Sequence, residues 1–252
     1  MLKKIALITG AAKGLGRNIA LEMAGQGIDL ILHYNRSEDE MKSLMEEIAQ
    51  YPVAVYPVQG DFTDNALLDR FFEEKIVPLF SEQTYSGLDY LINNAGIYEF
   101  DNFNKLNTEF LDRIFNINFK APLLLMKNCL KYMNDNGRII NILSTTAQRP
   151  YKKMIGYGAS KAALQNASKA MVPDFGKRGI TVNNIIPGVL AIDNKKMGVS
   201  EKIISEMYIK NYAVKRTGIP EDITGLIMFL TGEGSGWITG ENIEVSGGYI
   251  YQ

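Results

Sequence analysis

The stretch "KIALITGAAKGLG", residues 4–16, joins a short apolar run to three closely spaced glycines. An apolar run of this length that ends in a glycine-rich turn predicts a buried β-strand followed by a helix. Gly10, Gly14 and Gly16 permit a tight turn and let backbone N–H groups approach a phosphate. The spacing G-x-x-x-G-x-G differs from the commoner G-x-G-x-x-G, but its place after the first strand indicates a dinucleotide-binding loop.

The rest of the chain repeats this alternation of strand and helix. Strands are expected at 4–9, 28–34, 53–58, 88–93, 137–143, 180–186 and 242–245, and helices at 15–26, 38–50, 64–81, 108–134, 156–178 and 220–231. Apolar strands that alternate with helices predict a parallel sheet covered on both faces. We therefore expect an α/β fold: a single doubly wound, Rossmann-like domain over 1–252, with seven parallel strands and a small substrate lid at about 188–213.

Composition narrows the functional classes. The chain has 252 residues, of which 46% are apolar, and a net charge of −1, so it can form a core and has no basic surface suited to nucleic acid. Its apolar runs are too short to span a bilayer. With Cys129 as the one cysteine and His33 as the one histidine, neither an internal disulfide nor a zinc site is expected. We expect a soluble, cytoplasmic protein without a metal, and assign no role to His33.

The end of the second expected strand indicates which dinucleotide is bound. The segment "HYNRS", residues 33–37, has Tyr34 near the position where NAD-binding proteins carry an acidic residue for the ribose hydroxyls. Arg36, with Asn35 and Ser37 as further donors, could bind a 2′-phosphate, and Lys13 of the glycine loop would lie on the same side. These residues favour NADP(H) as the cofactor.

An ordered set of motifs extends along the whole chain. They are "TGAAKGLG" at 9, "GD" at 60, "NNAG" at 93, "NFK" at 118, "ILS" ending at 144, "YGASK" at 157, "IIPG" ending at 188 and "GIPEDI" at 218. In this order they resemble the short-chain dehydrogenase/reductase family, and most of all its 3-oxoacyl-[acyl-carrier-protein] reductase branch. The resemblance implies an NADPH-dependent reductase of 3-oxoacyl thioesters in fatty acid biosynthesis, acyl carrier protein as a partner, and a homotetramer formed through the helices at 108–134 and 156–178.

The resemblance also implies roles for individual residues. Asn118, Ser144, Tyr157 and Lys161 look like the catalytic tetrad. The residues that look like cofactor contacts are Gly10, Lys13, Gly14, Leu15, Gly16, Asn35, Arg36, Ser37, Asp61, Phe62, Asn94, Ala95, Gly96, Tyr157, Lys161, Pro187, Gly188 and Leu190.

Tyr157 and Lys161 are four residues apart on an expected helix, so they share one face. A nearby ammonium favours phenolate, which brings a phenol closer to the range needed for acid–base catalysis at neutral pH. During reduction Tyr157 would give its proton to the carbonyl oxygen, and Ser144 would hydrogen-bond the same oxygen. As in the family, Lys161 would hold the nicotinamide ribose and Asn118 would hold a water.

Some positions depart from the family pattern. Ile192 stands where the family often has a threonine beyond "PG", and Pro173 lies inside the expected helix 156–178, where proline tends to cause a kink. Of two basic residues that dock the acidic carrier in some relatives, Arg178 matches one, whereas Asp135 occupies the other position. A sugar, polyol or steroid alcohol dehydrogenase, a pterin reductase and a non-enzymatic dinucleotide sensor are the alternatives.

Overall fold

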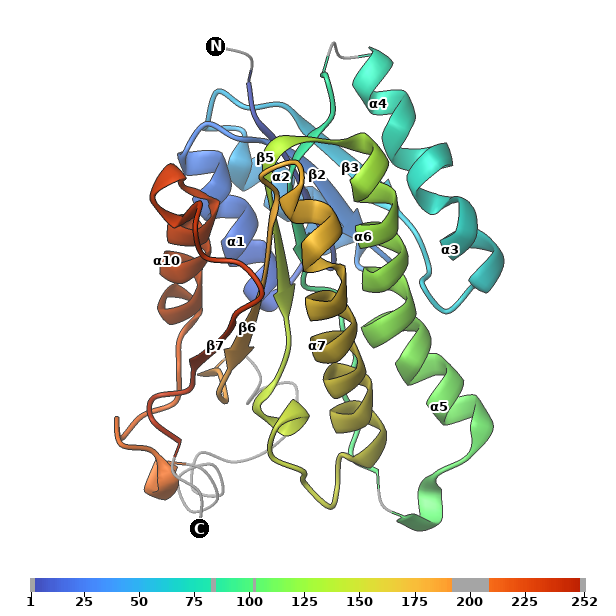
Figure 1. Ribbon diagram of the computed structural model, residues 1–252, viewed down its shortest axis with the longest axis vertical. Helices are drawn as coiled ribbons and strands as arrows, with labels where there is room; N and C mark the ends of the chain where they lie inside the picture. Colours follow the sequence, from blue (N-terminus) through green and yellow to red (C-terminus); the bar gives the residue numbers. More distant parts are fainter. Residues whose placement is uncertain (1–2, 83–84, 102, 192–208, 250–252) are drawn as a thin grey trace.

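The computed structural model of the protein describes residues 3–82, 85–101, 103–191 and 209–249 (Figure 1). Most of the lid expected at about 188–213, including Ile192, lies outside these residues.

One parallel sheet organises the described chain. Its strands are β1 (Ile5–Ile8), β2 (Asp29–Tyr34), β3 (Val55–Gln59), β4 (Leu88–Asn93), β5 (Met133–Ile142), β6 (Thr181–Pro187) and β7 (Asn242–Val245). They lie in the order β3-β2-β1-β4-β5-β6-β7, and every neighbouring pair is parallel. The predicted seven-stranded, doubly wound sheet is thus confirmed. β5 begins at Met133 rather than at 137, because Met133 pairs with Leu88 across an irregularity in the register.

Helices cover both faces of the sheet (Figure 1). One face carries α1 (Gly14–Gly25), α2 (Glu38–Ile48) and α10 (Pro220–Thr231), and the other carries α3 (Asn65–Phe71), α4 (Val77–Glu82), α6 (Ala121–Tyr132) and α7 (Ile155–Gly176). Successive strand residues point to opposite faces, so Ala6 and Ile8 join the α1 core whereas Ile5 and Leu7 join the α6–α7 core. Among the described helices, none has the length and apolar character needed to cross a membrane.

Two stretches expected as single helices each contain a π-helical turn. Phe72–Ile76 separates α3 from α4, and Asn116–Lys120 separates α5 (Thr108–Phe115) from α6. Such turns widen a helix and often occur at functional sites. The second one holds Asn118. By contrast, α7 stays α-helical through Pro173.

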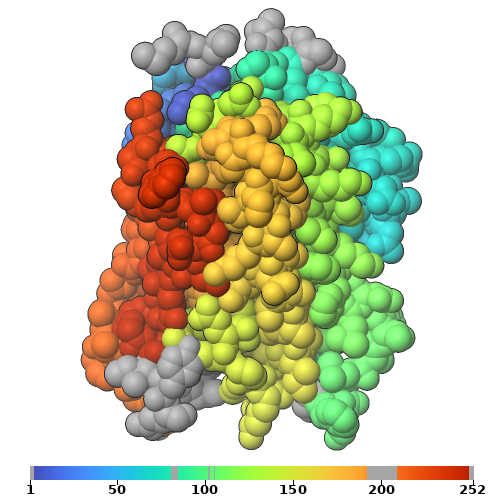
Figure 2. All heavy atoms as spheres, viewed as in Figure 1, coloured from blue at the N-terminus to red at the C-terminus, as the bar shows by residue number. Residues whose placement is uncertain are grey.

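A row of buried amides fastens α7 to the sheet. The side chains of Asn93, Asn141, Asn184 and Asn242 are hydrogen-bonded in series from β4 to β7, with distances of 2.8, 3.0 and 2.8 Å. Ser168 of α7 accepts a 2.9 Å hydrogen bond from Asn184. On the surface, α7 lies between the C-terminal segment and the α5–α6 stretch (Figure 2). The row fixes the helix that carries Tyr157 over the middle of the sheet.

Candidate active site

A cleft of about 1060 Å³ opens at the carboxyl edge of the sheet. Here β1 lies between β2 and β4, which is the switch point at which doubly wound sheets bind ligands. The residues predicted from sequence that line it are Gly10, Lys13, Gly14, Leu15, Asn35, Arg36, Ser37, Asn94, Ala95, Gly96, Ser144, Tyr157, Lys161, Pro187, Gly188 and Leu190. Four predicted residues, Gly16, Asp61, Phe62 and Asn118, are not among its lining residues.

The glycine loop is interlocked with the segment after β4. Thr9 Oγ1 accepts hydrogen bonds from the backbone N–H groups of Asn94 (3.0 Å) and Ala95 (2.9 Å). The Asn94 side chain donates to the carbonyls of Thr9 and Gly10. Gly10 has a φ of +65°, and a Cβ there would lie 2.9 Å from Ala95 Cα. Only glycine fits this turn, which leads to the N-terminus of α1, a favourable place for a phosphate.

The two basic residues expected to bind a 2′-phosphate lie near carboxylates. Lys13 Nζ is 2.5 Å from Glu40 Oε1, and Arg36, whose side chain is 88% exposed, is 4.0 Å from Asp61 Oδ2. Both basic residues line the cleft together with Ser37. The donors fit a phosphomonoester, which would compete with Glu40 for Lys13.

Lys161 is buried beneath the cleft. Its side chain is 4% exposed, and Nζ donates a 2.8 Å hydrogen bond to the carbonyl of Ile142 at the end of β5. Burial lowers the pKa of Lys161 to about 8, so the ammonium form still predominates at neutral pH. A Cβ on Gly96 would lie 3.4 Å from Nζ, which shows how closely the chain surrounds this group.

Ser144 follows β5 and is oriented by its own turn. Its Oγ accepts hydrogen bonds from Thr146 N (3.2 Å) and Thr146 Oγ1 (3.0 Å), which leaves the serine proton available for another acceptor. A Cβ on Gly158 would lie 2.9 Å from the Thr146 carbonyl oxygen. The glycine next to Tyr157 therefore lets the serine turn pack directly on α7.

The Asn118 side chain is occupied by contacts within the protein. Its Oδ1 accepts from Ile97 N (2.9 Å), and its Nδ2 donates to the Ile97 carbonyl (2.9 Å) and to Ser160 Oγ (3.1 Å). These bonds tie the segment after β4 to α7. The water-holding role of Asn118 stays a prediction.

Asp101 is a site residue that sequence reasoning missed. It is 3% exposed, and its carboxylate accepts from Ile155 N (2.8 Å) and Gly156 N (2.9 Å), the first N–H groups of α7. Met154, at the N-cap, offers no capping side chain. Asp101 thus supplies the cap from 54 residues away and fixes the position of Tyr157.

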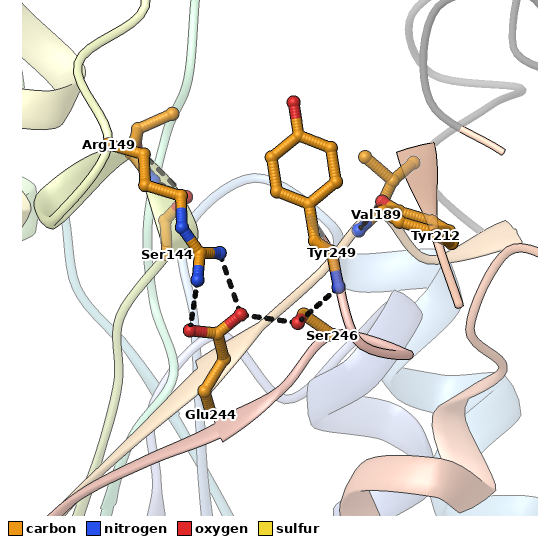
Figure 3. A network of polar contacts seen from close by, with 8 residues as sticks. Ser144, Arg149, Val189, Tyr212, Glu244, Ser246 and Tyr249 are labelled. Atoms are coloured by element: carbon orange, nitrogen blue, oxygen red, sulfur yellow. Dashed lines mark hydrogen bonds and ion pairs between the residues drawn. The ribbon is translucent and has the colours of Figure 1, made fainter. Parts of the chain in front are cut away.

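A second missed feature joins the serine turn to the C-terminal segment (Figure 3). Arg149 donates two 2.7 Å hydrogen bonds to Glu244, which lies 95 positions further along the chain. Glu244 accepts from Ser246, whose Oγ accepts from Tyr249 N at 3.3 Å. The Arg149 guanidinium also lies 5.5 Å from the centre of the Tyr249 ring. The result is a fixed position for Tyr249 in the cleft wall.

The same wall continues to the turn after β6. The rings of Tyr249 and Tyr212 meet edge to face at 5.3 Å, and Tyr212 OH accepts a 3.0 Å hydrogen bond from Val189 N (Figure 3). Residues 213–214 pair with 247–248 through backbone hydrogen bonds. A connected belt therefore runs from the serine turn to Val189, beside Gly188.

In the described ranges, no group of three or more His, Cys, Asp or Glu residues could hold a metal ion.

Comparisons with known proteins agree with this geometry. A family model described as enoyl-(acyl carrier protein) reductase matches residues 10–250. The chain is 31% identical to the short-chain dehydrogenase/reductase FrzI of a Cladobotryum species, over 99% of this chain and 97% of the relative. It is 29% identical to the hydroxynaphthalene reductase-like protein Arp2 of Metarhizium brunneum, over 98% and 95%. The crystal structure of the angucycline C-6 ketoreductase LanV with bound NADP matches with a TM-score of 0.90 and 30% identity, over 98% and 95%.

Replacing Glu40 tests the phosphate site. We expect Glu40→Gln to lower the dissociation constant for NADPH by about threefold, because Lys13 is released from a surface ion pair and a negative charge disappears. The dissociation constant for NADH should not change. Fluorescence titration measures both. The control is Glu47→Gln, on the same helix as Glu40, which breaks the ion pair between Glu47 and Arg17 of α1. An unchanged or weaker affinity for NADPH in Glu40→Gln would refute this assignment.

Replacing Lys161 tests the burial of its charge. Because the pKa of Lys161 is lowered in the folded state, the unfolded chain binds more protons between pH 8 and 10.5, and the native protein gains stability over that range. Lys161→Met removes this dependence, so its free energy of unfolding relative to the native protein should fall as the pH rises from 7.5 to 10.5. Denaturant titrations at several pH values measure it.

The exposed Lys152→Met provides the comparison. Its stability relative to the native protein should stay constant over the same pH range. If the difference in free energy of unfolding between Lys161→Met and the native protein is equally constant over this pH range, the result would contradict a buried ammonium.

Proposed function

The chain belongs to the short-chain dehydrogenase/reductase family, and from this premise we propose that it reduces a ketone on a flat aromatic ring system with NADPH. It is an NADP(H)-dependent oxidoreductase that interconverts C=O and CH–OH groups. The observation that carries the proposed substrate class is the group of tyrosines that line one cleft together with Ser144 and Tyr157.

The cleft residues account for the cofactor. The glycine loop and the N-terminus of α1 can offer N–H groups to the pyrophosphate, and Lys13, Arg36 and Ser37 line the same cleft with donors suited to a 2′-phosphate. NADP is also the molecule bound to the related ketoreductase LanV.

The chemistry follows from the three catalytic side chains that line the cleft. When bound, NADPH supplies a hydride to the carbonyl carbon. Ser144 donates a hydrogen bond to the carbonyl oxygen, since its Oγ already accepts from Thr146. Tyr157 gives its phenol proton to the same oxygen, so that the C=O bond gains one hydride and one proton and becomes an alcohol. The buried Lys161 ammonium favours the phenolate that remains.

The lining of the cleft favours an aromatic substrate. Tyr98 meets Tyr157 edge to face, with ring centres 6.1 Å apart, and Tyr212 meets Tyr249 in the same way within the belt. Tyr151 and Met154 also line the cleft. Aromatic rings gain from offset or edge-to-face contacts with other rings, and methionine sulfur adds favourable contacts with ring edges. Two of the three named relatives, the hydroxynaphthalene reductase-like Arp2 and the angucycline ketoreductase LanV, are named for ring-containing substrates.

A 3-oxoacyl thioester is the second candidate, and the arginines that could attract an acidic carrier do not favour it. Arg178 is bound to Asp135 at 2.8 Å and to the Leu130 carbonyl, and Arg149 is bound to Glu244. These arginines are therefore already paired within the chain. Attraction of an acidic carrier depends on summed positive charge.

Further charged residues bear on the attraction of an acidic carrier. Asp101 is a buried helix cap rather than a surface charge, and Lys152 and Lys153 are the exposed basic residues beside the serine turn. Lys195 and Lys196 lie outside the described residues. Use of acyl carrier protein, a role in fatty acid biosynthesis, a homotetramer, a cytoplasmic location and a single domain over 1–252 stay predictions.

A substrate panel with the Tyr157→Phe variant tests the function. We expect the native enzyme to oxidise NADPH with 1-tetralone at a higher kcat/KM than with a 3-oxoacyl N-acetylcysteamine thioester. Tyr157→Phe should lower turnover at least about a thousandfold, because it removes the phenol proton that the mechanism delivers to the carbonyl oxygen, while NADPH still binds. A higher kcat/KM for the thioester would reverse the order of the two substrate classes. Near-normal turnover by Tyr157→Phe would refute the mechanism.

Tyr249 tests the aromatic wall. Tyr249→Ala should raise KM for 1-tetralone about tenfold, because a stacking surface worth roughly 1 kcal/mol or more is lost together with its buried area. Tyr249→Phe keeps the ring and should change KM less than twofold. Steady-state kinetics at saturating NADPH measure both variants. Equal KM values for the alanine variant and the native enzyme would place the substrate elsewhere in the cleft.

A further inference from the structure

His33 is the one histidine of the chain, and the reaction described above does not use it. It lies near the end of β2, is 3% exposed, and is not among the residues that line the cleft. β2 lies between β1 and β3 in the sheet. The glycine loop follows β1, and the turn that carries Asp61 follows β3. His33 therefore sits between two segments of the predicted adenosine site.

The imidazole ring bonds to both segments. The backbone N–H of Gly10 donates to Nδ1 at 3.2 Å, and Nε2 is 3.0 Å from the carbonyl oxygen of Gly60. A carbonyl oxygen can only accept, so Nε2 carries the proton and Nδ1 keeps its lone pair for Gly10. Burial lowers the pKa of His33 to about 4, so the ring is neutral at neutral pH.

Ring packing and the backbone reinforce this link. His33 stacks on Phe62 with ring centres 4.0 Å apart and an interplanar angle of 5°. Phe71 meets both rings edge-on, at 5.5 and 5.1 Å. The His33 carbonyl accepts a 2.9 Å hydrogen bond from Ala11 N. Since Phe62 is 3% exposed, its side chain serves this stack, and a cofactor contact at this position would have to use its backbone.

We propose that His33 is a positioning residue for the dinucleotide, which sets the distance between the glycine loop at Gly10 and the turn that carries Asp61. Asp61 lies between Gly60 and Phe62, and His33 contacts both of these neighbours. Loss of the ring's hydrogen bonds would leave the half-buried Gly10 N–H and the buried Gly60 carbonyl without this partner, and the two segments would separate. The adenine ring and the pyrophosphate are common to NADPH and NADH, so both dinucleotides would lose affinity equally.

The test measures dinucleotide binding by fluorescence titration with His33→Phe, which keeps a stacking ring and removes both hydrogen bonds. The dissociation constants for NADPH and NADH should each rise about tenfold, with their ratio unchanged and with kcat at saturating NADPH within about twofold of the native value. His33→Gln, whose amide can both accept and donate, should recover part of the affinity. Arg36→Ala is the matched control, since it should weaken NADPH alone.

Unchanged dissociation constants for both dinucleotides in folded His33→Phe would overturn the proposal, and so would a loss confined to kcat. Binding needs no turnover, so the outcome is independent of the proposed ketone. If the native protein bound neither dinucleotide, the proposed function itself would fail.

If His33→Phe does not fold, a measurement on the native protein tests the proposal instead. Two-bond ¹H–¹⁵N correlation spectra of the single histidine should show a neutral ring protonated at Nε2 at pH 7, both free and with NADPH. A ring protonated at Nδ1 could not accept from Gly10 and would overturn the proposal.

Discussion

A buried ammonium group is the constraint on which the site depends. Lys161 donates to the Ile142 carbonyl at the end of β5 from a position that is nearly closed to water. Burying a charge is costly unless it is paired and hydrogen-bonded. The position of α7 must therefore keep Lys161 Nζ within hydrogen-bonding distance of the end of β5. Asp101 fixes the start of the helix, Ser168 fastens its middle to the amide row, and Gly158 brings it against the serine turn.

The fold could be predicted from sequence because its determinants are local. Each strand is an apolar run bounded by turn residues, and each helix has its own periodicity, so all seven strands appear where expected. Most of the motif residues line one cleft, because the carboxyl ends of parallel strands share one edge. The π turn at Asn116–Lys120 and the early start of β5 at Met133 were not predicted, since both depend on packing against other elements.

The rest of the site depends on pairs that no local pattern reveals. The cap from Asp101 crosses 54 residues and the Arg149–Glu244 pair crosses 95. Charges that look free in a sequence prove to be paired, as Arg178 is with Asp135 and Arg149 with Glu244. No role for His33 could be predicted from its position near a strand end, because the partners of its ring lie in the turns that follow two other strands.

The central claim is that this cleft delivers a hydride and a proton to one ketone. NADPH with both C4 hydrogens replaced by deuterium, incubated with 1-tetralone and the native enzyme, tests it most directly. Mass spectrometry and NMR of the product locate the label. One deuterium on the carbinol carbon of each alcohol, with a solvent-derived proton on its oxygen, is the predicted result. An alcohol without deuterium, or ketone and NADPH recovered unchanged, would contradict the claim.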